Sequence, residues 1–86
     1  MKAFGTKQCC YTYNTWKAHV RIIENKEEPW FWDLFLNESL IKPRWRTAAE
    51  AAFHASRADI GEEQLDRLFK NIHLPENVEE WHFMVL

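Results

Sequence analysis

The sequence has little glycine and proline and no long apolar run. Only two glycines and three prolines occur among 86 residues, which excludes collagen-like and linker-like compositions. No uninterrupted apolar stretch approaches the roughly 18 residues that a membrane-spanning helix needs. The start of the chain, Met1–Lys7, lacks the apolar region of a signal peptide. We therefore expect no membrane insertion and no secretion.

Cysteine is also scarce, and the two cysteines are neighbours. Side chains of adjacent residues point to opposite sides of a strand, so a disulfide between Cys9 and Cys10 would need a strained turn. The chain has no CxxC pair and no larger cysteine framework. We interpret both thiols as reduced and the protein as cytoplasmic.

Motifs that carry catalysis or metal binding are missing as well. The sequence has no glycine-rich phosphate loop and no serine nucleophile motif. A domain of this size also has little volume for a concave active site beside its own core. We predict no enzymatic activity, no metal, no cofactor and no small-molecule substrate. The four histidines fall on different predicted elements and lack the spacing of metal ligands. They are His19, His54, His73 and His82.

Large aromatic side chains, in contrast, are abundant. Five Trp, six Phe and two Tyr exclude a disordered chain, and the length allows one domain, residues 1–86. The net charge of −2 argues against indiscriminate binding to nucleic acid or anionic membranes. The charge is unevenly distributed, since residues 1–21 contain bases and no acid, whereas residues 62–86 are mainly acidic.

Alternation of apolar and polar residues predicts the strands of an antiparallel sheet. The first strand changes phase at Asn14–Thr15, which indicates a bulge or a break. The third is short and lies at an edge, because Pro43 cannot donate to a central ladder. The predicted strands are residues 9–24, 30–37, 40–46 and 80–86.

Two helices are predicted between the third and the last strand. Thr47 and Glu50 form a capping-box pattern before an alanine-rich run, and Gly61 is suited to end that helix. Asp59–Glu62 can cap a second helix, whose apolar stripe has the spacing of a core-facing surface. The stripe consists of Leu65, Leu68, Phe69 and Ile72.

These elements predict an α+β fold. We expect an antiparallel sheet of three or four strands with two helices on one face, in the order ββ(β)ααβ. The residues expected to be mostly buried are Trp16, Val20, Trp32, Leu34, Phe53, Leu65, Leu68 and Phe69.

The first two strands need a common core face, which determines what their other face carries. Pairing Ile22 with Trp30 places the even-numbered apolar residues together, and a slip by one residue would turn basic side chains into the core. The opposite face then carries Arg21 beside Phe31, His19 beside Asp33 and Lys17 beside Phe35.

Three interpretations of this basic and aromatic face stay open. The stems of Lys17 and Arg21 cover the rings, or a helix or Trp81 covers the whole face. Alternatively, the face binds a protein, because aromatic residues and arginine are enriched at interfaces. In the third interpretation the rings stack nucleic-acid bases, against which Asp33 and the acidic total count.

A further basic and aromatic cluster follows at Lys42–Arg46. Together, the pattern Trp16–Arg21, the aromatic second strand and Thr47–Ala52 resemble plant ethylene-response-factor DNA-binding domains. That family lays a three-stranded sheet on one helix and reads DNA with the sheet. The resemblance covers about half the chain, without the family's closely spaced Gly and Arg positions and with two further elements following, so we interpret it as a shared supersecondary pattern.

We predict a small cytoplasmic, tryptophan-rich interaction module that binds a protein partner or a second copy of itself through the basic and aromatic face. The aromatic surplus suggests that the chain, a second copy or a partner covers that face. The alternative is a nucleic-acid-binding module that uses the same face and Lys42–Arg46. The candidate binding residues are Lys17, His19, Arg21, Phe31, Phe35, Arg44, Trp45 and Arg46.

Overall fold

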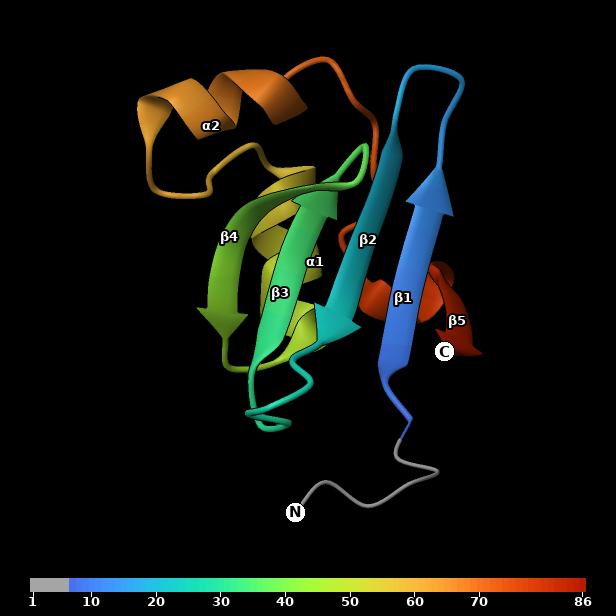
Figure 1. Cartoon of the computed structure of the whole chain (residues 1–86). Coiled ribbons are helices and arrows are strands. Elements are labelled where there is room, and N and C mark those ends of the chain that lie inside the picture. The colour runs from blue at the N-terminus through green and yellow to red at the C-terminus, as the bar shows by residue number, and fades with distance from the viewer. Residues whose placement is uncertain (1–6) are drawn as a thin grey trace.

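Five antiparallel strands form one sheet in the order β4-β3-β2-β1-β5 (Figure 1). The computed structural model describes residues 7–86. Met1–Thr6, on which the expected lack of a signal peptide depends, lie outside the described residues. The elements are β1 (Cys9–Asn14), β2 (His19–Glu24), β3 (Trp32–Leu36), β4 (Ser39–Trp45), α1 (Ala48–Ser56), α2 (Glu63–Phe69), the 3-10 turn η1 (Val78–Glu80) and β5 (His82–Val85).

The α+β class is confirmed, but the sheet is larger than predicted because residues 9–24 form two strands. The phase change at Asn14–Thr15 is a hairpin turn between β1 and β2. Thr15 closes this turn, since its backbone N–H donates to the Ala18 carbonyl at 2.8 Å and its Oγ1 accepts from the Ala18 N–H at 2.9 Å. A serine or threonine side chain that bonds nearby backbone in this way favours a turn over a continuous strand.

The predicted pairing of Ile22 with Trp30 was wrong, although the predicted core face of β2 was right. Ile22 lies opposite Leu34, four residues further along the chain. Asn25 is responsible, because its Oδ1 accepts from the N–H groups of Glu27 and Glu28 and its own N–H donates to the Phe31 carbonyl. This long turn contains residues that were expected to begin the second strand, so the pairing of β2 with β3 moves by four residues. Because four is an even number, each side chain stays on its predicted face of the sheet.

One face of the sheet packs against α1, which contacts β2, β3 and β4 and lies behind β3 in Figure 1. The helix contributes only alanines to its buried side, so its backbone can approach the sheet closely and the larger strand residues fill the layer. The central buried residues are Val20, Ile22, Leu34 and Leu36 from the strands and Ala48, Ala51, Ala52 and Ala55 from α1.

The predicted start of the first helix is confirmed, but its end is not. Thr47 Oγ1 accepts from the Glu50 N–H at 3.0 Å, as the capping pattern requires. The helix ends at Ser56, and Ala58 rather than Gly61 takes the left-handed conformation that follows, with φ of 54°. Gly61, with φ of 117°, lies in the connection between the helices.

The second helix is shorter than predicted and lies beyond the end of the sheet, beside α1 (Figure 1). The predicted cap at Asp59 was wrong, because Asp66 in α2 instead accepts from the N–H groups of Ile60 and Gly61. Phe69 and Ile72 enter the core from this side. Only α1 therefore lies across the sheet face that two helices were expected to share.

Several predicted core residues lie elsewhere. Val20, Leu34 and Phe69 are buried as predicted, and Trp32 and Leu65 are half-buried. The others were wrong: Trp16 is 90% exposed because it lies in the β1–β2 turn, and Phe53 and Leu68 lie on outward sides of their helices. Trp45, Trp81 and Val78 fill the core in their place.

Phe69→Ala should lower the free energy of unfolding by about 3–5 kcal/mol, because it removes a fully buried ring from the core. Urea denaturation followed by circular dichroism measures the change. The neighbouring Leu68→Ala is the matched control, since Leu68 is exposed and should cost less than about 1 kcal/mol. Equal losses in the two variants would contradict the observed orientation of α2.

Thr47→Ala should destabilise the protein by about 0.5–2 kcal/mol, because the Glu50 N–H loses its acceptor. Thr47→Ser keeps the hydroxyl and should remain close to the wild type. Thermal unfolding of both variants checks the cap, and a loss of the same size in the serine variant would show that the methyl group matters instead.

Candidate functional site

The second face of the sheet has no helix over it in residues 7–86. Figure 1 shows this face toward the viewer, with α1 behind the sheet and α2 beyond its end. Strand register assigns its members, since cross-strand partners share a face. We call it the helix-free face; its residues are Cys10, Thr12, Asn14, His19, Arg21, Ile23, Asp33, Phe35, Leu40, His82 and Met84.

Small side chains form the floor of the helix-free face. Cys10 and Thr12 on β1 are buried although no helix lies above them. Cys10 lies between Ile23 and Met84, and Thr12 lies opposite Arg21, so the longer neighbours close over them. Thr12 Oγ1 also donates to the Val20 carbonyl at 3.2 Å, which satisfies the buried hydroxyl.

A polar network crosses one end of the helix-free face. The Arg21 Nε–H donates to His19 Nε2 at 3.1 Å, so the neutral imidazole carries its hydrogen on Nδ1. His19 Nδ1 lies 3.7 Å and Arg21 Nη2 3.9 Å from the same oxygen of Glu38. Glu38 is exposed and both distances are long, so the ion pairs contribute little to stability.

The tight turn between β3 and β4 positions this network. Asn37 and Glu38 both have positive φ, 50° and 72°, as the two central residues of a two-residue hairpin require. Asn37 Oδ1 accepts from the His19 N–H at 2.9 Å, and the Asn37 N–H donates to the His19 carbonyl at 2.8 Å. The turn is thereby tied to the start of β2, where the basic side chains lie.

Apolar side chains continue from the network toward both edges of the sheet. Ile23 and Phe35 are half-buried near the centre. Leu40 on β4 is 52% exposed and Met84 on β5 is 37% exposed. The sequence prediction missed Ile23, Leu40, Met84 and Glu38. Alternation along β2 could have found Ile23, whereas the others required the register of strands that the sequence did not define.

Of the residues predicted on this face, four lie on it, namely His19, Arg21, Asp33 and Phe35. Arg21 lies opposite Phe35, not beside Phe31 as predicted. Lys17 is in the β1–β2 turn, where its Nζ donates to the Asn71 carbonyl at 3.3 Å. The four-residue change of register separates Arg21 from Phe31, whereas the turn between β1 and β2 removes Lys17 from the face.

Phe31 lies in the turn before β3 and contacts Arg44 instead. The Arg44 guanidinium carbon is 5.5 Å from the centre of the Phe31 ring, and Arg44 Nη2 is 3.3 Å from Glu28 Oε1. Asp33, expected beside His19, accepts from the Arg44 N–H at 3.2 Å and from Asn25 Nδ2 at 3.0 Å. Phe31 and Arg44 thus belong to a structural cluster at the β2–β3 turn.

Trp81 was one candidate to cover the basic face, and this interpretation was wrong. Trp81 is buried on the α1 side of the sheet, where its ring lies 5.9 Å from that of Tyr13. Its Nε1 donates to the Pro75 carbonyl at 3.0 Å. The chain therefore uses this tryptophan for the core.

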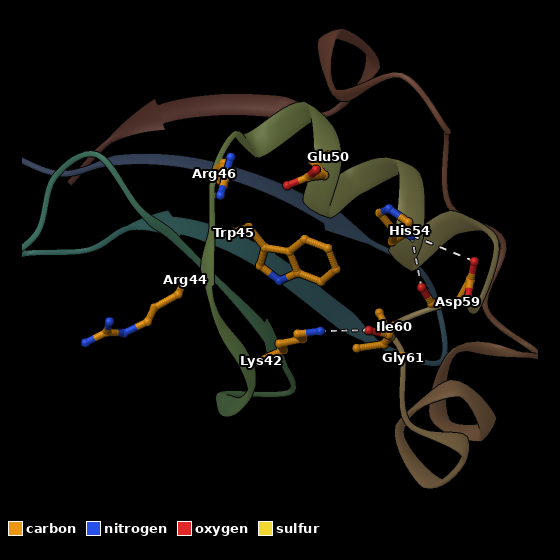
Figure 2. A pocket seen from close by; sticks show the side chains of 9 residues that line it. All are labelled: Lys42, Arg44, Trp45, Arg46, Glu50, His54, Asp59, Ile60 and Gly61. Carbon is orange, nitrogen blue, oxygen red and sulfur yellow. Dashed lines mark hydrogen bonds and ion pairs between the residues drawn. The ribbon is translucent and has the colours of Figure 1, made fainter.

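The remaining predicted residues, Trp45 and Arg46, lie on the other side of the molecule. Trp45 is buried opposite Trp32, stacks on His54 at 5.4 Å between ring centres, and has Lys42 Nζ 5.1 Å from its ring. Figure 2 shows these side chains around an open pocket of about 470 Å³ between β4 and α1, together with Arg46, Glu50, Asp59, Ile60 and Gly61.

The pocket is lined by both basic and acidic side chains, and some of its polar groups already contact neighbouring backbone. Lys42 Nζ donates to the Ile60 carbonyl at 3.0 Å, and His54 Nδ1 lies 3.0 Å from the Asp59 carbonyl (Figure 2). Trp45 Nε1 is buried without a hydrogen-bond partner among the described residues. Because Trp45 is buried and His54 stacks on its ring, the pocket offers no free aromatic platform for a nucleobase.

No protein-family model, curated protein or solved structure matches the chain. The resemblance to ethylene-response-factor domains stays one of pattern, and the sheet here has five strands. Within residues 7–86, no helix has the length and apolar character to span a bilayer, and no three His, Cys, Asp or Glu side chains are grouped to hold a metal ion.

The two thiols differ from ordinary cysteines, because burial raises the pKa of each. For Cys9, the negative charge of Glu24 and a hydrogen bond to its side chain raise the pKa further. For Cys10, burial outweighs the lowering effect of Arg21 on the pKa. Both groups should be poor nucleophiles near neutral pH, because the thiolate is the reactive form.

Glu24→Gln should lower the pKa of Cys9, since it removes the negative charge while keeping an acceptor for the Cys9 N–H. Alkylation of Cys9 by iodoacetamide, followed against pH by mass spectrometry, should then proceed at lower pH. Glu27→Gln, in the exposed turn, is the control. An unchanged pH profile in Glu24→Gln would contradict the influence of this carboxylate.

Proposed function

We propose that the protein is a non-enzymatic interaction module that binds another protein through the helix-free face. The observation that carries this proposal is an apolar surface beside a half-exposed arginine on a sheet face that no described helix covers. Phe35 and Leu40 form the apolar part, and Arg21 lies opposite Phe35. Aromatic residues and arginine are the side chains that most often dominate binding energy at protein interfaces.

The chemistry of the face indicates the kind of partner. Ile23, Phe35 and Leu40 favour an apolar partner surface. The ion pair of Arg21 with the exposed Glu38 is long, so a carboxylate of the partner can compete for the guanidinium group. The partner is thus expected to present an acidic side chain within an apolar patch.

A nucleic-acid partner has less support. Lys17 and Phe31 lie away from the face, and the acidic Glu38 lies next to its basic residues. Phosphate contacts would therefore meet a nearby negative charge. Arg44 is engaged by Glu28, and Trp45 is buried, so the Lys42–Arg46 segment offers little continuous platform.

Variants of Arg21 and Phe35 test the proposal. Proteins captured by the wild type are purified, and their dissociation constants are measured by calorimetry for wild type, Phe35→Ala and Arg21→Glu. A contact residue at the centre of the interface should cost about 2 kcal/mol or more, which is roughly a 30-fold weaker affinity. Arg46→Glu, exposed and outside the face, should bind like the wild type.

Circular dichroism must show that Phe35→Ala is folded, because this ring is half-buried. Affinity retained in both face variants would contradict the proposed surface. Titration with single-stranded and duplex DNA is the parallel measurement. An affinity that falls linearly with log salt concentration and is lost in Arg21→Glu would establish the nucleic-acid alternative instead.

A further inference from the structure

The two edges of the sheet are built very differently. The β4 edge is protected against pairing: Pro43 lacks an N–H, Arg44 has φ of 67°, and the pairing with β3 is irregular. Charged residues lie on either side of the proline. Each of these features discourages the addition of another strand.

The β5 edge has none of these protections. Its sequence, His-Phe-Met-Val, contains no proline and no permanently charged side chain, and its register with β1 is regular. All four residues are exposed, with Phe83 at 48% and Val85 at 52%. A regular, apolar and uncharged edge is a template for strand pairing.

The direction of the free backbone groups on β5 follows from its pairing with β1. The Leu86 N–H donates to the Gln8 carbonyl at 2.8 Å, so residue 86 faces β1. Backbone groups alternate in direction along an antiparallel strand, which turns those of Met84 toward β1 as well. The N–H and C=O groups of Phe83 and Val85 therefore point outward, and no strand in residues 7–86 pairs with them.

We propose that β5 is a dimerisation edge, at which the β5 strand of a second copy of this chain adds in antiparallel orientation. The outward groups of Phe83 and Val85 determine the register. Phe83 pairs with Val85 of the second copy, and the symmetry-related pair exchanges the same bonds. Met84 then lies opposite Met84 of the second copy, on the twofold axis.

Charge favours a second copy as the occupant of this edge. Two β5 strands meet without repulsion, because neither carries a permanently charged side chain. In the antiparallel arrangement, the acidic Glu79 and Glu80 before β5 lie at the same end of the joined sheet as Lys7, which precedes β1, of the other copy. Opposite charges of the two copies thus lie at the same end of the joined sheet, once for each copy.

This inference does not depend on the proposed function. The dimer would join two five-stranded sheets edge to edge and leave both helix-free faces open, side by side. Arg21→Glu, which should weaken partner binding, should leave the dimer intact. The two proposals can therefore fail separately.

A disulfide at the twofold axis tests the register. Residues that directly face each other without exchanging hydrogen bonds have Cα atoms about 4.5 Å apart, within the range that a disulfide spans. Met84→Cys should form a covalent dimer on mild oxidation, seen by non-reducing electrophoresis. Leu40→Cys, at the β4 edge and more exposed than Met84, is one control, and the wild type with its Cys9 and Cys10 is the other; both should stay unlinked.

Analytical ultracentrifugation tests the edge without a cross-link. The wild type should sediment as a concentration-dependent dimer. Val85→Lys should be a monomer, because each lysine would lie opposite Phe83 of the other copy. Val85→Thr, which adds no charge, should remain a dimer. A wild type that stays monomeric up to millimolar concentration overturns the proposal and leaves the edge for a strand of a different protein. A dimer that persists in Val85→Lys, or equal cross-linking of Leu40→Cys, also overturns it. Should Val85→Lys fail to fold, the cross-linking result decides.

Discussion

The close contact between the alanine side of α1 and the aliphatic centre of the sheet is the constraint on which this structure depends. Ala51, Ala52 and Ala55 are fully buried against a layer that includes Ile22 and Leu34. Small helix residues bring the two backbones together, so bulky strand residues suffice to fill one layer. The larger side chains Trp45, Phe69 and Trp81 then close the layer at its borders.

A single helix across the sheet leaves the second face of the sheet without a covering element in residues 7–86. The chain closes one face with α1 and places α2 beyond the end of the sheet, so the described residues supply no element for the other face (Figure 1). Cys10 and Thr12 stay buried there because longer cross-strand neighbours cover them. What remains outward is an apolar surface around Arg21, together with the unprotected β5 edge. Both surfaces are left open because a small domain has few helices with which to cover its sheet.

Local interactions account for much of what could be predicted from the sequence. The cap at Thr47, the edge position of Pro43 and the core side of Val20 and Ile22 depend on a few neighbouring residues or on a two-residue period, and all are observed. The candidate site was predicted only in part, with His19, Arg21 and Phe35 together. The site depended on the register between β2 and β3. The alternation of apolar and polar residues cannot distinguish registers that differ by an even number of residues.

The sequence by itself thus determined the α+β class, the faces of β2 and β3 and the start of α1, because period and capping act over short distances. Only the tertiary structure decided that Asn25 organises a long turn, that Trp45 and Trp81 enter the core while Trp16 remains outside, and that β5 forms an open edge. The identity of a residue as tryptophan does not reveal whether it lies in the core or in an exposed turn. Its place is decided by which strands pair, and that pairing depends on contacts between residues far apart in the chain.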